Sequence, residues 1–120
     1  VLPIVQERPD IRGMRSAIRA VASGAPLVVF PEGARTPDGN LQPAQPGVGL
    51  LVIKTGAPVL PVRIRGAHAA WPRDSKKIRL RPISLTVGPL IPSIVPPEGL
   101  RGQEACQAVS DQIMAAIAKL

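Results

Sequence analysis

A four-residue apolar run, Leu27–Phe30, stops abruptly at Pro31, and this break constrains the fold more than any other feature of the sequence. Proline has no backbone N–H and cannot donate a ladder hydrogen bond, so strand pairing is expected to end there. Gly33 lets the backbone turn tightly or approach a ligand closely. Arg35 then offers a planar fork of donors suited to phosphate or carboxylate. The pattern predicts a buried central strand that ends in a polar loop, the place where ligands bind in open α/β sheets.

A second interpretation of this loop needs no ligand. Pro31, Glu32 and Gly33 together make a good turn, and a solvated glutamate and arginine beside a turn are common at protein surfaces. The local pattern alone does not separate an ordinary turn from a binding loop. The elements that follow the loop therefore carry the argument.

The sequence after the loop predicts a strand–helix–strand unit. A helix is expected over residues 47–55 and a strand over residues 59–64. Together with a strand at 27–30 they form a βαβ unit, whose strands are parallel with a right-handed crossover. We therefore expect an α/β chain with a partial, mostly parallel sheet and flanking helices. The positive end of the helix near Gly47 would lie at the same sheet edge as residues 32–35, and the two could hold a phosphate between them.

Three further elements are expected on either side of this unit. Asp10 is a suitable N-cap for a helix over residues 11–22, a strand fits residues 83–87, and a last helix fits residues 102–119. The arginines of the first helix lie off its apolar stripe and are expected to form a solvated face. They are Arg12, Arg15 and Arg19.

The charge of the chain favours anionic partners. The formal net charge is +7 and the isoelectric point is about 11.1, so the surface should attract nucleic acid, anionic lipid headgroups or phosphorylated substrates. Single-stranded nucleic acid would need several stacking aromatic side chains, and the chain has one Trp, one Phe and no Tyr. No apolar run reaches the roughly 18–20 residues of a membrane-spanning helix.

Cations gather in the sequence around the single tryptophan. They are Arg73, Lys76, Lys77, Arg79 and Arg81. Trp71 among these cations could lie at a lipid headgroup layer, or it could cap the core beside a solvated basic loop. The sequence leaves both interpretations open.

Several blocks of the chain resemble the glycerolipid acyltransferase family, the 1-acylglycerol-3-phosphate acyltransferases of phospholipid synthesis. Residues 30–36, Phe-Pro-Glu-Gly-Ala-Arg-Thr, resemble the family's Phe-Pro-Glu-Gly-Thr-Arg-Ser block. Residues 57–64 resemble its Val-Pro-Val-x-Ile block, and residues 46–47 with the following helix resemble its Lys-Gly-helix segment. Residues 70–72, Ala-Trp-Pro, recur in bacterial members. The match covers about residues 1–92.

The resemblance implies roles for individual residues. In the family, the glutamate, glycine and arginine of the first block help to hold the glycerol phosphate. The matching residues here are Glu32, Gly33 and Arg35. An upstream arginine also contacts the phosphate in the family, but Gln6 stands about where it is expected, and Arg8 is the candidate to replace it. The Val-Pro-Val block lies near the acyl-donor region, which points to Pro61.

The family's His-x-x-x-x-Asp block, which supplies the general base and its orienting carboxylate, is absent from these 120 residues. The single histidine is His68, and the residue five positions later is Arg73. His68 also lies downstream of the other blocks, whereas the resemblance implies that the His-x-x-x-x-Asp block precedes Val1 in an intact member. The sequence does not begin with methionine and is expected to be the interior of a longer protein. The chain alone is then expected to have no useful acyltransferase rate.

The resemblance thus implies that residues 1–120 are a single partial acyltransferase domain, with the helix over 102–119 beyond the family match. The parent would be a bacterial enzyme of phospholipid synthesis, peripheral on the cytoplasmic face of the cell membrane. It would use acyl-CoA or acyl carrier protein as co-substrate, without a metal or other cofactor, and a lysophosphatidate-like acceptor. Two alternatives are a non-catalytic basic module that binds anionic lipid or nucleic acid, and a degenerate family member without function.

Overall fold

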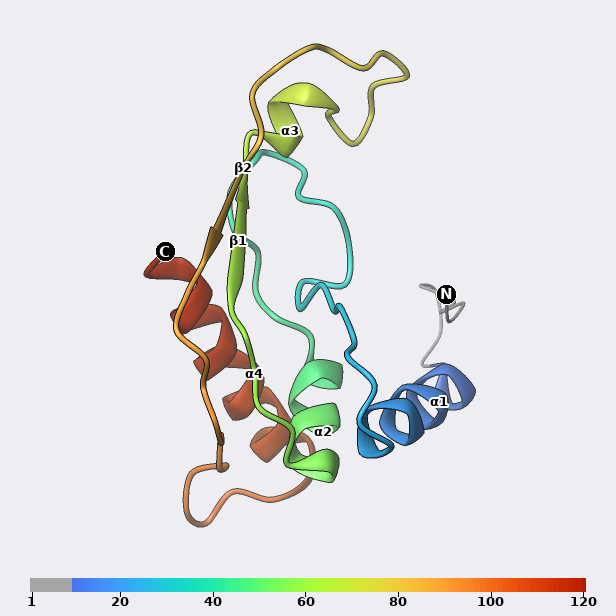
Figure 1. Cartoon of the computed structure of the whole chain (residues 1–120), viewed down its shortest axis with the longest axis vertical. Coiled ribbons are helices and arrows are strands. Elements are labelled where there is room, and N and C mark those ends of the chain that lie inside the picture. Colours follow the sequence, from blue (N-terminus) through green and yellow to red (C-terminus); the bar gives the residue numbers. More distant parts are fainter. Residues whose placement is uncertain (1–9) are drawn as a thin grey trace.

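A computed structural model describes residues 10–120 of the chain, so Arg8 and the rest of the first nine residues lie outside the described part. Helices α2 and α4 lie side by side at one end of the molecule, and α3 with the loop after it occupies the opposite end (Figure 1). The elements in chain order are α1 (Ile11–Ala22), α2 (Pro46–Thr55), β1 (Val62–Arg65), α3 (Ala67–Ala70), β2 (Ser84–Val87) and α4 (Gly102–Ala118).

The three long helices predicted from the sequence are confirmed to within one residue at each end. The Asp10 side chain accepts a hydrogen bond from the Gly13 N–H at 2.9 Å, which makes it the N-cap of α1 as expected. The arginines of α1 are exposed, so the predicted solvated face is confirmed. Its buried positions are Gly13 and Ala17, whereas Ile11 of the apolar stripe is exposed. None of the described helices is long and apolar enough to cross a membrane.

The hydrophobic core lies between α2 and α4. Its buried cluster joins Val52 of α2 to three residues of α4, which are Val109, Ile113 and Ile117. Aliphatic side chains supply this core because the chain has almost no aromatic residues. The final helix therefore packs mainly on α2, with fewer contacts to β1.

The two core helices cross closely at Gly49. A Cβ atom at this position would collide with the backbone carbonyl of Cys106 in α4, so only glycine fits the crossing. The Gly49 N–H belongs to the first turn of α2, where donors have no acceptor within the helix. It donates instead to the buried Ser110 Oγ of α4 at 2.9 Å. The contact at Gly49 thus gives a backbone donor at the start of α2 an acceptor, and it sets the distance between the two helices.

The sheet is where the structure departs most from the sequence-based prediction. The α/β class with flanking helices is confirmed, but the sheet of residues 10–120 has two strands, and they are antiparallel. Val62 of β1 lies opposite Val87 of β2, and a bridge between Val59 and Ile91 continues the pairing outward. The predicted βαβ unit with parallel strands is not found among these residues.

Leu27–Phe30 is the segment that causes this difference. The described part of the chain contains no strand that pairs with it, and the side chains of Val28 and Phe30 are exposed. An apolar run signals the tendency to form a strand, but a strand exists only where a neighbour accepts its backbone hydrogen bonds. The prediction of a buried central strand is therefore wrong for residues 10–120.

Candidate functional site

The predicted polar turn is held to the segment that leads into α2. The Gln45 N–H donates to the Pro31 carbonyl at 2.8 Å. The Glu32 carboxylate accepts the backbone N–H of Gln42 at 2.8 Å. Gly33 has a φ of +73°, a conformation that favours glycine, and its backbone faces the side chain of Gln45. Glu32 and Gly33 thus serve the geometry of the loop, whatever else they contact.

Arg35 makes its contacts on the other side of the loop, with the segment around α3. Its guanidinium carbon lies 4.9 Å from the centroid of the Trp71 ring, and its Nη2 donates to the Arg73 carbonyl at 3.3 Å. The indole is itself fixed, because Trp71 Nε1–H donates to the Ser75 carbonyl at 2.8 Å. The Trp71 backbone N–H donates to Ala67 of α3 at 2.9 Å. Two segments 36 residues apart in sequence therefore meet at the Arg35–Trp71 pair.

These contacts bear on the role of Trp71 and on the place of the polar turn. Trp71 is 48% exposed and carries Arg35 on its ring, so it does not cap the core. The predicted proximity of the polar turn and the N-terminus of α2 is found for Pro31 and Gly33, which lie against Gln45, the N-cap of α2. Arg35 instead contacts the segment around α3. Arg35 contacts α3 because residues 36–45 carry the chain to α3 before it returns to α2 (Figure 1). The Gly49 N–H in the first turn of α2 is already bound to Ser110. A phosphate site between Arg35 and α2 stays a prediction.

The tip of this excursion is a tight hydrogen-bonded turn. The Asn40 N–H donates to Asp38 Oδ1 at 3.0 Å, and the Asn40 side-chain amide donates to Asp38 Oδ2 at 3.0 Å. The Thr36 hydroxyl donates to the Asn40 carbonyl at 2.7 Å and accepts the Gly39 N–H at 3.0 Å. The hydrogen bond from the Asn40 backbone, with smaller contributions from the Asn40 and Thr36 side chains, holds the pKa of Asp38 below its ordinary value of 3.8. The turn is therefore complete at neutral pH and loosens only when the carboxylate is protonated in acid.

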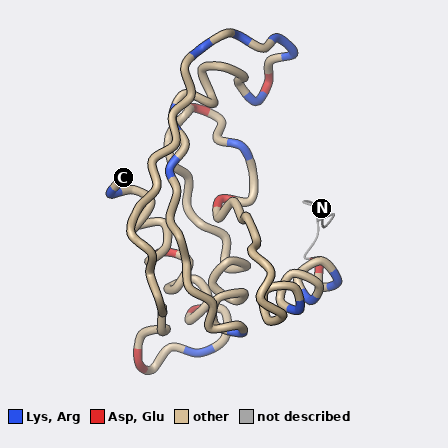
Figure 2. The backbone as a smooth tube through the Cα atoms, in the orientation of Figure 1, with Lys and Arg blue, Asp and Glu red and all other residues tan. Residues whose placement is uncertain are grey.

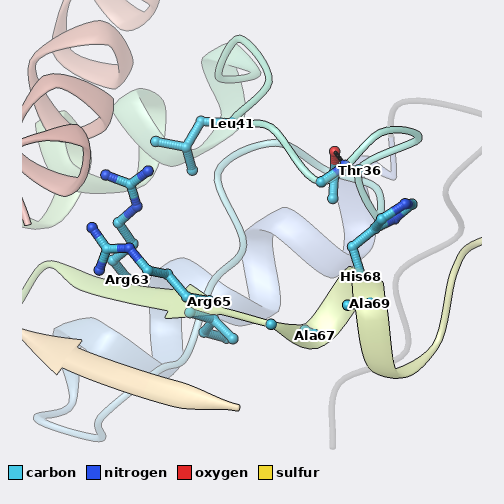
Figure 3. Close-up of a pocket in the computed structure, with 10 residues that line it drawn as sticks. Thr36, Leu41, Arg63, Arg65, Ala67, His68 and Ala69 are labelled. Atoms are coloured by element: carbon cyan, nitrogen blue, oxygen red, sulfur yellow. Dashed lines mark hydrogen bonds between the residues drawn. The ribbon is translucent and has the colours of Figure 1, made fainter. Parts of the chain in front are cut away.

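A cavity of about 380 Å³ lies between this excursion, β1 and α3. Figure 3 shows Arg63 and Arg65 extending from β1 on the side of Leu41, with Thr36 and His68 together at the other end. The His68 ring packs against the backbone of Gly39. The cavity thus has cationic side chains at one end and polar side chains at the other.

Sequence reasoning missed the two arginines of this wall. Arg63 and Arg65 are two residues apart in β1, and alternate residues of a strand share one face, so a period of two was the available signal. Arg63 Nη1 donates to the Ala118 carbonyl at the end of α4 at 2.9 Å, and Arg65 Nη1 donates to Thr86 Oγ1 at 3.4 Å. Their charges make the wall suited to an anion.

The remaining residues implied by the resemblance lie elsewhere. Pro61 is buried where the ladder begins, and its carbonyl accepts the Gly88 N–H at 2.8 Å. Its role near an acyl donor stays a prediction. Arg8 precedes the described residues. His68 lines the cavity but has no aspartate at the spacing that the family's catalytic block requires.

The basic residues around Trp71 form a second surface, at the end of the molecule opposite the core. We define the basic loop as residues 72–83, between α3 and β2. Lysines and arginines gather there and along α1 (Figure 2). Two apolar side chains alternate with these cations, Ile78 at 71% exposure and Leu80 fully exposed. The predicted cluster of cations is thus confirmed as a surface feature that also presents bare hydrophobic groups.

Comparison with known proteins places these features in a wider context. The family model described as Acyltransferase matches residues 3–65. A 1-acyl-sn-glycerol-3-phosphate acyltransferase of Limnanthes alba is 35% identical over 83 residues, which are 68% of this chain and 29% of that protein. One from Chlamydomonas reinhardtii is 25% identical over 113 residues, 94% of this chain and 33% of that protein.

A solved structure shows a similar fold. The crystal structure of the 1-acyl-sn-glycerophosphate (LPA) acyltransferase PlsC from Thermotoga maritima matches with a TM-score of 0.69 and 28% sequence identity. The match covers 92% of this chain and 46% of that one. The chain thus spans between about a quarter and a half of the length of proteins that it matches.

Proposed function

Because this chain belongs to the acyltransferase family, we propose that the whole protein transfers a fatty acyl group to a 1-acylglycerol 3-phosphate acceptor. The acyl donor in this proposal is acyl-CoA or acyl carrier protein. These 120 residues contribute the part that holds the acceptor phosphate, and Arg35 is its main ligand. The observation that supports this role is the fixed position of Arg35 on Trp71, next to the cations of the basic loop.

In the proposed reaction, these 120 residues need only to supply positive charge and to position the acceptor. The acceptor hydroxyl oxygen forms a bond to the thioester carbonyl carbon, the carbon–sulfur bond breaks, and the thiol leaves. The hydroxyl proton passes to a general base and from there to the departing sulfur. The resemblance assigns that base to a His-x-x-x-x-Asp block outside these residues. The phosphate ligand orients the acceptor for attack, which converts binding energy into a higher rate.

The experiment that tests this proposal is Arg35→Ala in the full-length protein. The substitution removes a charged hydrogen-bond donor, so the kcat/KM for the lysophosphatidate acceptor should fall at least about tenfold, while the KM for the acyl donor stays the same. Arg19→Ala on the solvated face of α1 is the control, because it removes the same charge away from the site. Unchanged acceptor kinetics in Arg35→Ala would remove Arg35 from the phosphate site.

We further propose that the protein works as a peripheral protein at an anionic membrane surface, on the cytoplasmic side. The basic loop supports this, since five cations and the exposed Ile78 and Leu80 suit a layer of acidic headgroups over acyl chains. The same feature also favours the second candidate function, a non-catalytic module that binds anionic lipid. Acyl transfer by the full-length protein would exclude that second candidate as the whole function.

A further inference from the structure

We infer that Trp71 is a positioning residue for Arg35, whose indole face fixes the plane of the guanidinium so that its edge is free for a phosphate. This inference rests on the proposed function of Arg35 and adds to it a residue outside the acceptor contacts. The two side chains meet at 4.9 Å between the guanidinium carbon and the ring centroid. Arginine stacks on aromatic rings at such distances by attraction between the cation and the ring quadrupole.

Stacking and hydrogen bonding use different parts of a guanidinium. The stack occupies the flat face, whereas the five N–H donors point outward in the plane. In this structure one donor, at Nη2, is directed to the Arg73 carbonyl. Trp71 therefore restrains Arg35 without consuming any donor that a phosphate oxygen needs. A lysine or an acidic partner in place of Trp71 could not combine these properties.

The indole is held by hydrogen bonds that do not involve Arg35. Its Nε1–H donates to the Ser75 carbonyl at 2.8 Å, and its backbone N–H donates to Ala67 at 2.9 Å. Rotation of the ring would break the first of these hydrogen bonds. The short helix α3 and the turn that follows it thus hold the Trp71 ring in place. The long and otherwise flexible Arg35 side chain packs on this ring.

A flexible arginine loses rotamer freedom when it binds a ligand, and pre-orientation lowers that cost. The acceptor should therefore bind more weakly when the Trp71 ring is removed, while the chemical step is unaffected. In the full-length protein, Trp71→Ala is expected to raise the KM for the lysophosphatidate acceptor about three- to fivefold at constant kcat. Trp71→Phe keeps a ring and should recover part of this loss.

The decisive measurement is a double-mutant cycle with Arg35→Ala. If Trp71 acts through Arg35, Trp71→Ala should change the acceptor KM in the parent background and leave it unchanged in the Arg35→Ala background. Equal effects of Trp71→Ala in both backgrounds would overturn the inference and leave the role of Arg35 intact. An unchanged acceptor kcat/KM in Arg35→Ala alone would instead contradict the proposed function, and with it this inference.

A spectroscopic readout tests the contact without any substrate. The difference in fluorescence between the protein and its Trp71→Phe variant isolates the emission of Trp71. Arg35→Ala should shift the emission wavelength of Trp71, because it removes the cation that lies over the ring. Arg19→Ala should leave the emission unchanged. Emission that is the same with and without Arg35 would overturn the contact itself.

Discussion

Glu32 and Arg35 stand three positions apart in one motif, yet they contact different parts of the chain. The Glu32 carboxylate accepts the Gln42 N–H and closes the base of the excursion, while Arg35 rests on Trp71 near α3. Glu32 thus stabilises the loop, whereas Arg35 makes no contact with the base of the loop. In the proposed function, the motif therefore contains one residue that holds the loop, Glu32, and one residue that binds the phosphate, Arg35.

This division leads to a prediction for Glu32. Glu32→Ala leaves the half-buried loop without an acceptor for the Gln42 N–H, so the free energy of unfolding should fall by about 1–3 kcal/mol. Glu32→Gln keeps an acceptor oxygen at the same reach, so it should lose less than half as much. Urea unfolding of both variants measures the difference. Equal losses would mean that the carboxylate acts through its charge rather than through this hydrogen bond.

At the scale of elements, the crossing of α2 and α4 is the contact that the fold depends on most. The core cluster lies entirely on these two helices, and Gly49 sets how closely they approach. The buried Ser110 hydroxyl then satisfies a backbone donor that the crossing would otherwise leave without a partner. The small size of Gly49 and the hydrogen bond from its N–H to Ser110 thus stabilise the same helix crossing.

We expect Gly49→Ala to be one of the most damaging single substitutions in the chain. The new methyl group meets the Cys106 backbone carbonyl, which cannot move without displacing α4, so the free energy of unfolding should fall by at least about 2 kcal/mol. Gly47→Ala is the matched control in the same helix. Its methyl group would lie 3.2 Å from the end of the flexible Met14 side chain, which can move aside. Thermal unfolding of the two variants compares them, and similar losses would contradict this account.

The aliphatic core on α2 and α4 and the basic loop after α3 lie at opposite ends of the molecule (Figure 1). A membrane approached by the basic loop would meet cations and exposed apolar groups first, and the helix pair would stay in water. This arrangement is what the proposed peripheral attachment requires of the chain.

The proposed membrane attachment can be tested by measuring binding of the protein to lipid vesicles. Replacing Lys77, Arg79 and Arg81 by Gln should weaken binding of the full-length protein to phosphatidylglycerol-containing vesicles, on the order of 100-fold at low salt. The control removes the same charge from α1, as Arg12, Arg15 and Arg19→Gln, and should weaken binding much less. Sedimentation with acidic and with zwitterionic vesicles, at low and high salt, measures both. Equal losses in the two triple variants would show attraction by net charge alone.

Much of this architecture could be predicted from the sequence because it is local. Helix periodicity and the Asp10 cap placed the three long helices, and the Phe30–Thr36 block correctly indicated the acyltransferase family. What could not be predicted depends on partners distant in sequence. The state of residues 27–30 depends on a neighbouring strand, and the place of Arg35 depends on a tryptophan 36 residues later.

The tight crossing of α2 and α4 also has a consequence for how the chain is made. Gly49 and Ser110 are 61 residues apart, so at synthesis rates of 5–20 residues per second α2 waits about 3–12 s for its partner. During that interval its apolar residues have no α4 to cover them, and they offer a binding site for chaperones or a route to aggregation. Slow codons between the two helices would lengthen this exposure. The yield of folded protein should therefore depend on how quickly the ribosome reaches α4.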